Sequence, residues 1–93
     1  MVNKKADDKM ISDLYELIAS LNSAEECRDL FSDLCTFKEI EQMAQRIKAA
    51  KLLVEGKTYQ QITDVCDISP ATLSRVSRCV QYGKGYSKFL GNK

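Results

Sequence analysis

The chain has 93 residues, of which 44% are apolar, and its formal net charge is +1. This length suits one small domain and is too short for two independent hydrophobic cores. The apolar fraction, with one proline and four glycines, argues against a disordered chain. No apolar run approaches the roughly 20 residues needed to cross a bilayer.

Charge is distributed unevenly along the chain. Residues 1–45 carry five basic and ten acidic side chains, a net charge of −5, whereas residues 46–93 carry nine basic and three acidic ones, a net charge of +6. A basic half is the electrostatic footprint of a polyanion-binding surface, although solvated helix faces also produce such runs. The N-terminus leads into an amphipathic segment instead of a signal sequence, so we expect a cytoplasmic protein.

Two amphipathic helices are predicted in the acidic half. Apolar residues recur at helical spacing over about 7–21 and predict the first helix. Ser23 and Glu26 form a capping-box pattern before the second, which runs to about Cys35. The residues that we expect this second helix to bury are Cys27, Leu30, Phe31 and Leu34.

The longest predicted helix runs from about Phe37 to Glu55, and Gly56 is the expected C-terminal cap. Leu52 and Leu53 project away from its main apolar stripe. A helix that is apolar on more than one side is surrounded, so we expect it to be the central element of the fold. The main stripe consists of Ile40, Met43, Ala44, Ile47, Ala50 and Val54.

A helix-turn-helix pattern follows directly. Thr58 and Gln61 form a capping box that opens a short helix. Its apolar residues Ile62 and Val65 point to one side. Residues 66–68 form the corner, where Asp67 occupies the position that usually needs glycine, and aspartate tolerates the left-handed conformation better than most residues.

The second helix of this pattern has the composition of a recognition helix. Ser69 is the expected N-cap, and Pro70 suits the first helical position because its missing N–H would have no partner there. Leu73, Val76 and Val80 line one side, and Ala71, Ser74, Arg75, Arg78 and Tyr82 line the other. Small residues allow close approach to the major groove, and arginine can bond two guanine acceptors. Two capped helices of an ordinary bundle remain the alternative interpretation.

We therefore expect a single all-α domain, 1–93. Residues 6–57 form a helical scaffold, residues 58–82 the helix-turn-helix, and residues 83–93 a C-terminal tail that either docks as a single turn or stays mobile.

The four cysteines do not indicate a metal site. The chain has no CxxC pair and no histidine, so the usual zinc spacings are missing and no cofactor is expected. In a reducing cytosol each thiol is best interpreted as a small apolar core residue. These residues are Cys27, Cys35, Cys66 and Cys79.

Two stretches, QRIKAAKLLVEGKTYQQI and SPATLSR, carry a resemblance to a known family. With a glycine-ended helix immediately before the helix-turn-helix, the chain resembles the Trp repressor superfamily and most closely its YerC/YecD branch. The resemblance implies an all-helical homodimer in which helices of both chains interlace into one core, with two projecting recognition helices.

The resemblance also implies a candidate effector site. In the Trp repressor two arginines flank the bound tryptophan, and the matching positions here are Arg46 and Arg75. The small residue after the second arginine is replaced by Val76, whose branched side chain would fill part of the slot. We therefore do not carry tryptophan binding over, and another small-molecule effector remains open.

The favoured function is a sequence-specific DNA-binding transcriptional regulator, most simply a repressor, acting as a homodimer on double-stranded DNA. Recognition helices about 34 Å apart predict a pseudo-palindromic operator. Arg75 and Arg78 are expected at or near base edges. The full set of candidate DNA-binding residues is Lys57, Ser69, Pro70, Ala71, Thr72, Ser74, Arg75, Arg78, Lys84 and Lys88.

The sequence leaves two other functions open. A protein-interaction module that keeps the helix-turn-helix shape without binding DNA would use the apolar tail residues Tyr82, Tyr86, Phe89 and Leu90. A small helical enzyme would use Arg46, Lys48, Lys51 and Glu55 around an anionic substrate. With no histidine and no acid or base beside a catalytic partner, we expect no enzyme.

Overall fold

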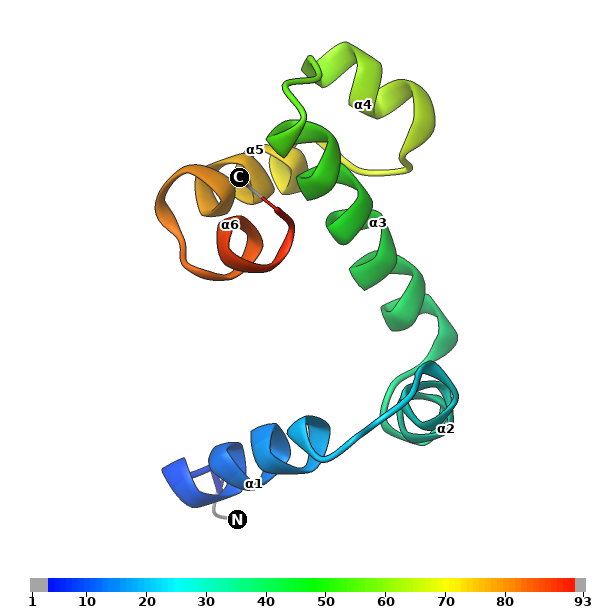
Figure 1. Cartoon of the computed structure of the whole chain (residues 1–93), viewed down its shortest axis with the longest axis vertical. Coiled ribbons are helices and arrows are strands. Elements are labelled where there is room, and N and C mark those ends of the chain that lie inside the picture. Colours follow the sequence, from blue (N-terminus) through cyan, green and yellow to red (C-terminus); the bar gives the residue numbers. More distant parts are fainter. Residues whose placement is uncertain (1–3, 92–93) are drawn as a thin grey trace. The chain divides into compact units, whose positions relative to one another are not determined.

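The computed structural model describes residues 4–91, and every regular element in that range is a helix (Figure 1). The predicted all-α class is confirmed. Contacts divide the chain into two compact units, residues 1–36 and residues 37–93. None of the helices in the described range is long and apolar enough to span a lipid bilayer.

The first unit contains α1 (Asp8–Ala19) and α2 (Ala24–Leu34). Asp7 caps α1 by accepting the Met10 N–H at 2.9 Å. The helix ends two residues earlier than predicted, and there the Ser20 hydroxyl donates to the Leu17 carbonyl at 2.6 Å, a local bond that competes with helix propagation. Helix α2 begins as predicted.

Ser23 is the N-cap of α2 and accepts the Glu26 N–H at 3.0 Å. The Glu26 carboxylate returns a bond one residue earlier than in a standard capping box, by accepting the Asn22 N–H at 2.7 Å. The N-terminal capping bonds of this unit are therefore made between residues near one another in sequence.

The apolar faces of α1 and α2 are not buried in the single chain. Neither helix has a buried residue, and the exposed fractions of Met10, Leu17 and Leu34 are 59%, 50% and 50%. The predictions that Cys27 lies in a core and that α2 buries Leu34 are wrong for one chain, because Cys27 is exposed as well. Two short helices have too little apolar area to enclose their own stripes.

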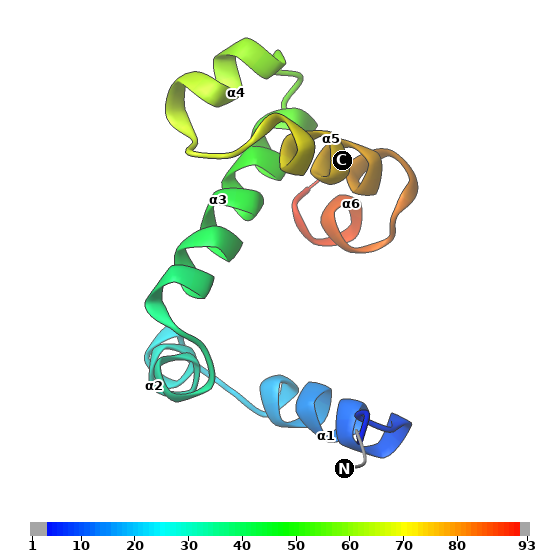
Figure 2. The same ribbon diagram turned by 180° about the vertical axis from the view of Figure 1, so that it is seen from behind.

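The second unit begins with α3 (Phe37–Val54) and continues with α4 (Tyr59–Val65), α5 (Pro70–Tyr82) and α6 (Gly85–Phe89). Helix α3 contacts each of the other three, and α5 also contacts α6. Both views show α5 beside the C-terminal half of α3, with α6 next to α5 (Figures 1 and 2). The predicted central role of α3 holds within this unit.

Gly56 ends α3 as predicted. Its φ is +89°, its N–H donates to the Leu53 carbonyl at 3.0 Å, and the Lys57 N–H donates to the Leu52 carbonyl at 2.9 Å. These two bonds form a Schellman motif, which satisfies helix carbonyls that would otherwise lack partners. The reversal leads directly into Thr58, the N-cap of α4.

The core of the second unit lies where α3, α4 and α5 meet. Ala49 and Ile62 are 0% exposed, Leu73 is 1% exposed, and Cys66 is 5% exposed. Ala50 and Val76 are also buried. The alanines are small, which allows α3 to approach its neighbours closely.

Leu52 and Leu53 pack against the core cluster, so α3 is apolar on more than one side, as predicted. Other details of the predicted apolar pattern are wrong. Ile47, assigned to the main stripe of α3, is 44% exposed. Val65 was expected inside but is 65% exposed. Cys66 fills the inward position instead, because it lies four residues after Ile62 and so shares its side of the chain.

The tail docks as a short helix. Gly83 ends α5, and its N–H donates to the Cys79 carbonyl at 2.8 Å. Helix α6 contacts both α3 and α5, so of the two predicted alternatives the docked one is found. Residues 92 and 93 of the predicted tail lie outside the described residues.

Candidate nucleic-acid interface

Local capping builds the helix-turn-helix as predicted. Thr58 Oγ1 accepts the Gln61 N–H at 3.1 Å, and Gln61 Oε1 accepts the Thr58 N–H at 2.9 Å. Ser69 caps α5 by accepting the Thr72 N–H at 3.1 Å, with Pro70 in the first helical turn. These bonds fix where α4 and α5 begin, and therefore which residues of α5 face the core.

The corner between the helices differs from the prediction. No non-glycine residue in the described range has a positive φ, so Asp67 does not adopt the left-handed conformation. Cys66 is instead extended, with φ −116° and ψ 137°. The Asp67 N–H donates to Gln45 Oε1 of α3 at 3.1 Å, so a side chain 22 residues away satisfies the corner.

Helix α5 presents a cationic exposed side. Leu73 and Val76 are buried beneath it, whereas Arg75, Arg78 and Ser74 are exposed. Neither arginine has an ion-pair partner within residues 4–91. Both guanidinium groups are therefore available to an anionic ligand, and the helix carries no acidic residue that would repel one.

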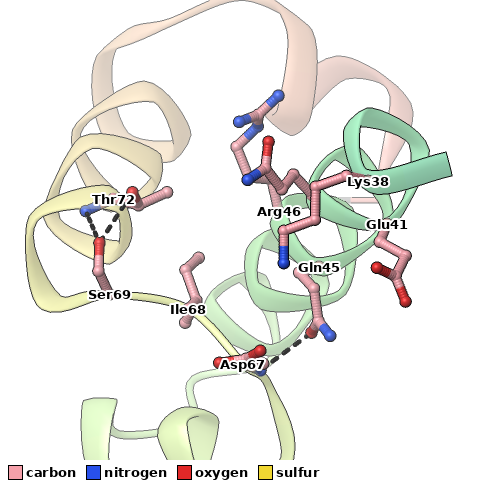
Figure 3. A pocket seen from close by; sticks show the side chains of 9 residues that line it. Lys38, Glu41, Gln45, Arg46, Asp67, Ile68, Ser69 and Thr72 are labelled. Atoms are coloured by element: carbon pink, nitrogen blue, oxygen red, sulfur yellow. Dashed lines mark hydrogen bonds between the residues drawn. The ribbon is translucent and has the colours of Figure 1, made fainter. Parts of the chain in front are cut away.

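The first turn of α5 carries four more of the predicted residues. Ser69, Pro70 and Ala71 are exposed and Thr72 is half-buried. The Ser69 hydroxyl donates to Thr72 Oγ1 at 2.9 Å, which holds the two side chains together at the start of the helix (Figure 3). The structure thus gathers six of the predicted contact residues and Ser69 itself on α5 and its cap.

The predicted lysines lie on other elements. Lys57 is exposed between α3 and α4, and Lys84 and Lys88 are exposed in the C-terminal segment. The Lys88 ammonium lies 5.4 Å from the centroid of the neighbouring Phe89 ring. These lysines therefore lie outside α5, on segments that flank it in the sequence.

A polar hollow of about 390 Å³ lies between α3 and the corner of the helix-turn-helix. Figure 3 shows Lys38, Gln45 and Arg46 on the α3 wall and Ile68, Ser69 and Thr72 on the other. Arg46, one of the two predicted effector residues, lines this hollow and is half-buried. Arg75, the other, is not among the residues that line it.

A second hollow, of about 450 Å³, is mainly apolar and lies where α6 meets α3 and α5. Its lining includes Ile47, Cys79, Tyr86 and Leu90. Phe89 lies at its edge and is 77% exposed, and Tyr82 nearby in the sequence is 81% exposed. This apolar surface belongs to the second unit alone.

Metal ligation finds no support in the described part of the chain. Within residues 4–91 no three or more cysteine, aspartate or glutamate side chains are grouped so that they could hold a metal ion. All four cysteines are free thiols. Of these, Cys66 is buried, Cys35 and Cys79 are half-buried, and Cys27 is exposed.

The sequence did not predict Gln45 as a residue that holds the corner of the helix-turn-helix. Gln45 lies next to Arg46 in the QRIKAAKLLVEG stretch, but its partner is the backbone of Asp67. A glutamine has no local pattern that would reveal an acceptor for a distant N–H. Only the packing of the corner against α3 brings the two groups together.

Known proteins resemble this chain in sequence and in fold. Residues 9–92 match the family model described as Trp repressor protein. The chain is 46% identical over 79 residues to the uncharacterized protein YerC of Bacillus subtilis (strain 168), covering 85% of this chain and 76% of YerC.

Two solved structures are also similar. A candidate Trp repressor from Staphylococcus aureus superposes with a TM-score of 0.85 at 38% identity, covering 90% of this chain and 85% of the other. A TrpR-like protein from Eubacterium eligens ATCC 27750 superposes with a TM-score of 0.82 at 40% identity, covering 86% of this chain and 84% of the other.

Proposed function

This chain belongs to the Trp repressor family, and from that premise we propose that it is a sequence-specific DNA-binding transcriptional regulator, a repressor, that acts as a homodimer. The family is one of repressors and not of enzymes. The observation that best supports DNA binding is the exposed side of α5, where Arg75 and Arg78 lie above a buried apolar side and have no ion-pair partner within residues 4–91.

In this proposal different residues of α5 have different roles in DNA recognition. Arg75 and Arg78 contact base edges in the major groove, where a guanidinium can donate two bonds to guanine. Pro70 and Ala71 are small and exposed, so the start of the helix can approach DNA closely. Ser74 adds a hydroxyl in the same stretch. Base contacts of this kind determine which sequence is bound.

Other predicted residues would position the protein on the phosphate backbone. Lys57, Lys84 and Lys88 are exposed cations on elements flanking α5. Ser69 and Thr72 offer hydroxyls at the start of the helix. Phosphate contacts fix register and contribute affinity that weakens as salt concentration rises.

The unburied apolar faces of the first unit support a homodimer. α1 and α2 have no buried residue in the single chain, although their apolar residues recur at helical spacing. Burying those faces against a second copy would remove this surface from water. Two copies would present two α5 helices to one pseudo-palindromic operator. We also propose that the protein acts in the cytoplasm.

A small-molecule effector is a second proposal, favoured by the polar hollow beside Arg46. A guanidinium in a half-buried position suits a carboxylate or another anionic group. Val76 is 2% exposed, so its branched side chain already occupies space in the core beneath α5. We therefore disfavour tryptophan as the ligand. The proposed effector residues are Arg46, which lines the hollow, and Arg75, which does not line it and is proposed from the resemblance alone.

The exposed Tyr82 and Phe89 favour one alternative, an interaction module that does not bind DNA. Selection of bound duplexes from a random pool distinguishes this alternative from the proposed DNA-binding function. Selection of bound duplexes, with and without added amino acids, should enrich a two-fold symmetric site and reveal any ligand dependence. Failure to enrich any sequence, together with no salt-dependent binding to random duplexes, would exclude the regulator and favour the module.

A further inference from the structure

The corner of the helix-turn-helix is attached to α3 through three consecutive residues. Cys66 is buried in the core, and Ile68 is half-buried and packs against the same cluster. Between them, the Asp67 N–H donates to Gln45 Oε1 at 3.1 Å, a bond drawn in Figure 3. Gln45 itself is half-buried on α3.

These attachments differ in what they constrain. Apolar burial at Cys66 and Ile68 is non-directional and depends on the area removed from water. A hydrogen bond weakens steeply as its angle departs from linearity, so it also constrains orientation. Of these attachments to α3, the bond to Gln45 is therefore the directional one.

The direction of the corner determines the direction of α5. Only Ile68 separates Asp67 from Ser69, the N-cap of α5. A small rotation at Asp67 would be carried along α5 to Arg75 and Arg78. Bidentate contacts with bases tolerate little misplacement, whereas lysine contacts with phosphates tolerate more.

We propose that Gln45 is a positioning residue that sets the orientation of α5 and thereby the sequence selectivity of DNA binding. This inference rests on the proposed DNA-binding function. Gln45 touches no DNA in this account and acts through the Asp67 backbone. Its loss should reduce binding to the preferred duplex more than binding to random duplexes.

The test compares substitutions at Gln45 with the same substitutions at Gln42, which lines the same polar hollow one turn earlier on α3. Gln45→Met keeps the side chain's length but removes the acceptor. We expect it to weaken binding to the preferred duplex by roughly 2- to 12-fold, the range corresponding to one net hydrogen bond. Binding to a random duplex should change by less than about 2-fold. With no small molecule added, so that the proposed effector hollow is not engaged, Gln42→Met should change neither affinity.

Glutamate substitutions test whether an acceptor at position 45 is enough to preserve selectivity. Gln45→Glu retains an acceptor for the Asp67 N–H, and Gln42→Glu adds the same negative charge without that acceptor role. If Gln45 acts by positioning, the two glutamate variants should have the same ratio of preferred to random binding as the unaltered chain. A ratio lowered equally in Gln45→Glu and Gln45→Met would show that any change at this position matters, and would overturn the proposal.

Amide hydrogen exchange tests the bond itself without DNA. The Asp67 N–H should exchange faster in Gln45→Met than in Gln42→Met, while amides in the middle of α5 remain protected in both. Unchanged selectivity in a folded Gln45→Met variant would overturn the positioning role alone. If the unaltered chain prefers no duplex, the proposed function fails and this role fails with it, even if the exchange result is as expected.

Discussion

Replacing Gly56 with alanine should destabilise the protein, although nothing crowds the position. Gly56 has φ +89°, and a Cβ built there would meet no atom within 4 Å. The cost therefore comes from the backbone alone, about 1–2 kcal/mol for a non-glycine residue at positive φ. For a chain of this size that corresponds to a decrease in Tm of roughly 4–16 °C.

Thermal unfolding followed by circular dichroism, at one fixed protein concentration, measures this decrease. The fixed concentration matters because dimerisation would make Tm depend on it. Gly91→Ala is a matched control, since Gly91 has φ +85° and equally open surroundings but follows only the five-residue helix α6. Its strain can be relieved by fraying of α6, so we expect a smaller decrease in Tm.

The sign of the change distinguishes two accounts of Gly56. Where an alanine fits the native φ, replacing glycine stabilises a protein by about 0.4–1 kcal/mol, because the unfolded chain loses freedom. An unchanged or raised Tm for Gly56→Ala would therefore show that the Schellman reversal between α3 and α4 is not required in its present form.

Three further substitutions test capping, packing and charge. Thr58→Ala removes the N-cap of α4 and should lower the free energy of unfolding by about 1 kcal/mol in urea denaturation; no change would show that the capping box is dispensable. Leu73→Ala, at a side chain only 1% exposed, should cost about 2–5 kcal/mol in the same assay, and a cost below that range would indicate that the core beneath α5 collapses around the vacancy. Lys57→Ala should reduce the slope of log affinity against log salt by about one in DNA titrations. An unaltered slope would remove Lys57 from the phosphate contacts.

The local parts of the fold could be predicted from the sequence because their determinants lie within a few residues. Thr58 with Gln61 marked the start of α4, and Ser69 with Pro70 marked the start of α5. Gly56 marked the end of α3. Each signal depends on hydrogen bonds between near neighbours, which folding in three dimensions does not reassign.

The mistaken predictions all depend on tertiary packing. Val65 has the spacing of a buried residue, but the chain leaves the helix at Cys66 and turns that thiol inward instead. Asp67 does not adopt the left-handed conformation, and the acceptor of its N–H is Gln45, a side chain distant in sequence. Cys27 is exposed because its own unit leaves that part of α2 open to solvent, although Leu30 and Phe31 are half-buried. Periodicity identifies an apolar face but not what that face contacts.

The sequence predicted the exposed residues of α5 but not the contacts that hold the corner of the helix-turn-helix against α3. The exposed side of α5 follows from helical spacing, once Leu73 and Val76 are recognised as the buried side. The polar hollow and the bond from Asp67 to Gln45 require α3 to lie beside the corner. No spacing within either segment encodes that relation.

The most direct test of DNA reading by α5 is the affinity of Arg75→Lys for the selected duplex and for a random duplex. Lysine keeps the positive charge but cannot reproduce the bidentate geometry of a guanidinium. We predict that discrimination between the duplexes falls by about 1–3 kcal/mol, while the salt dependence of random binding stays the same. Equal affinity ratios for the variant and the unaltered chain would contradict base reading by this helix.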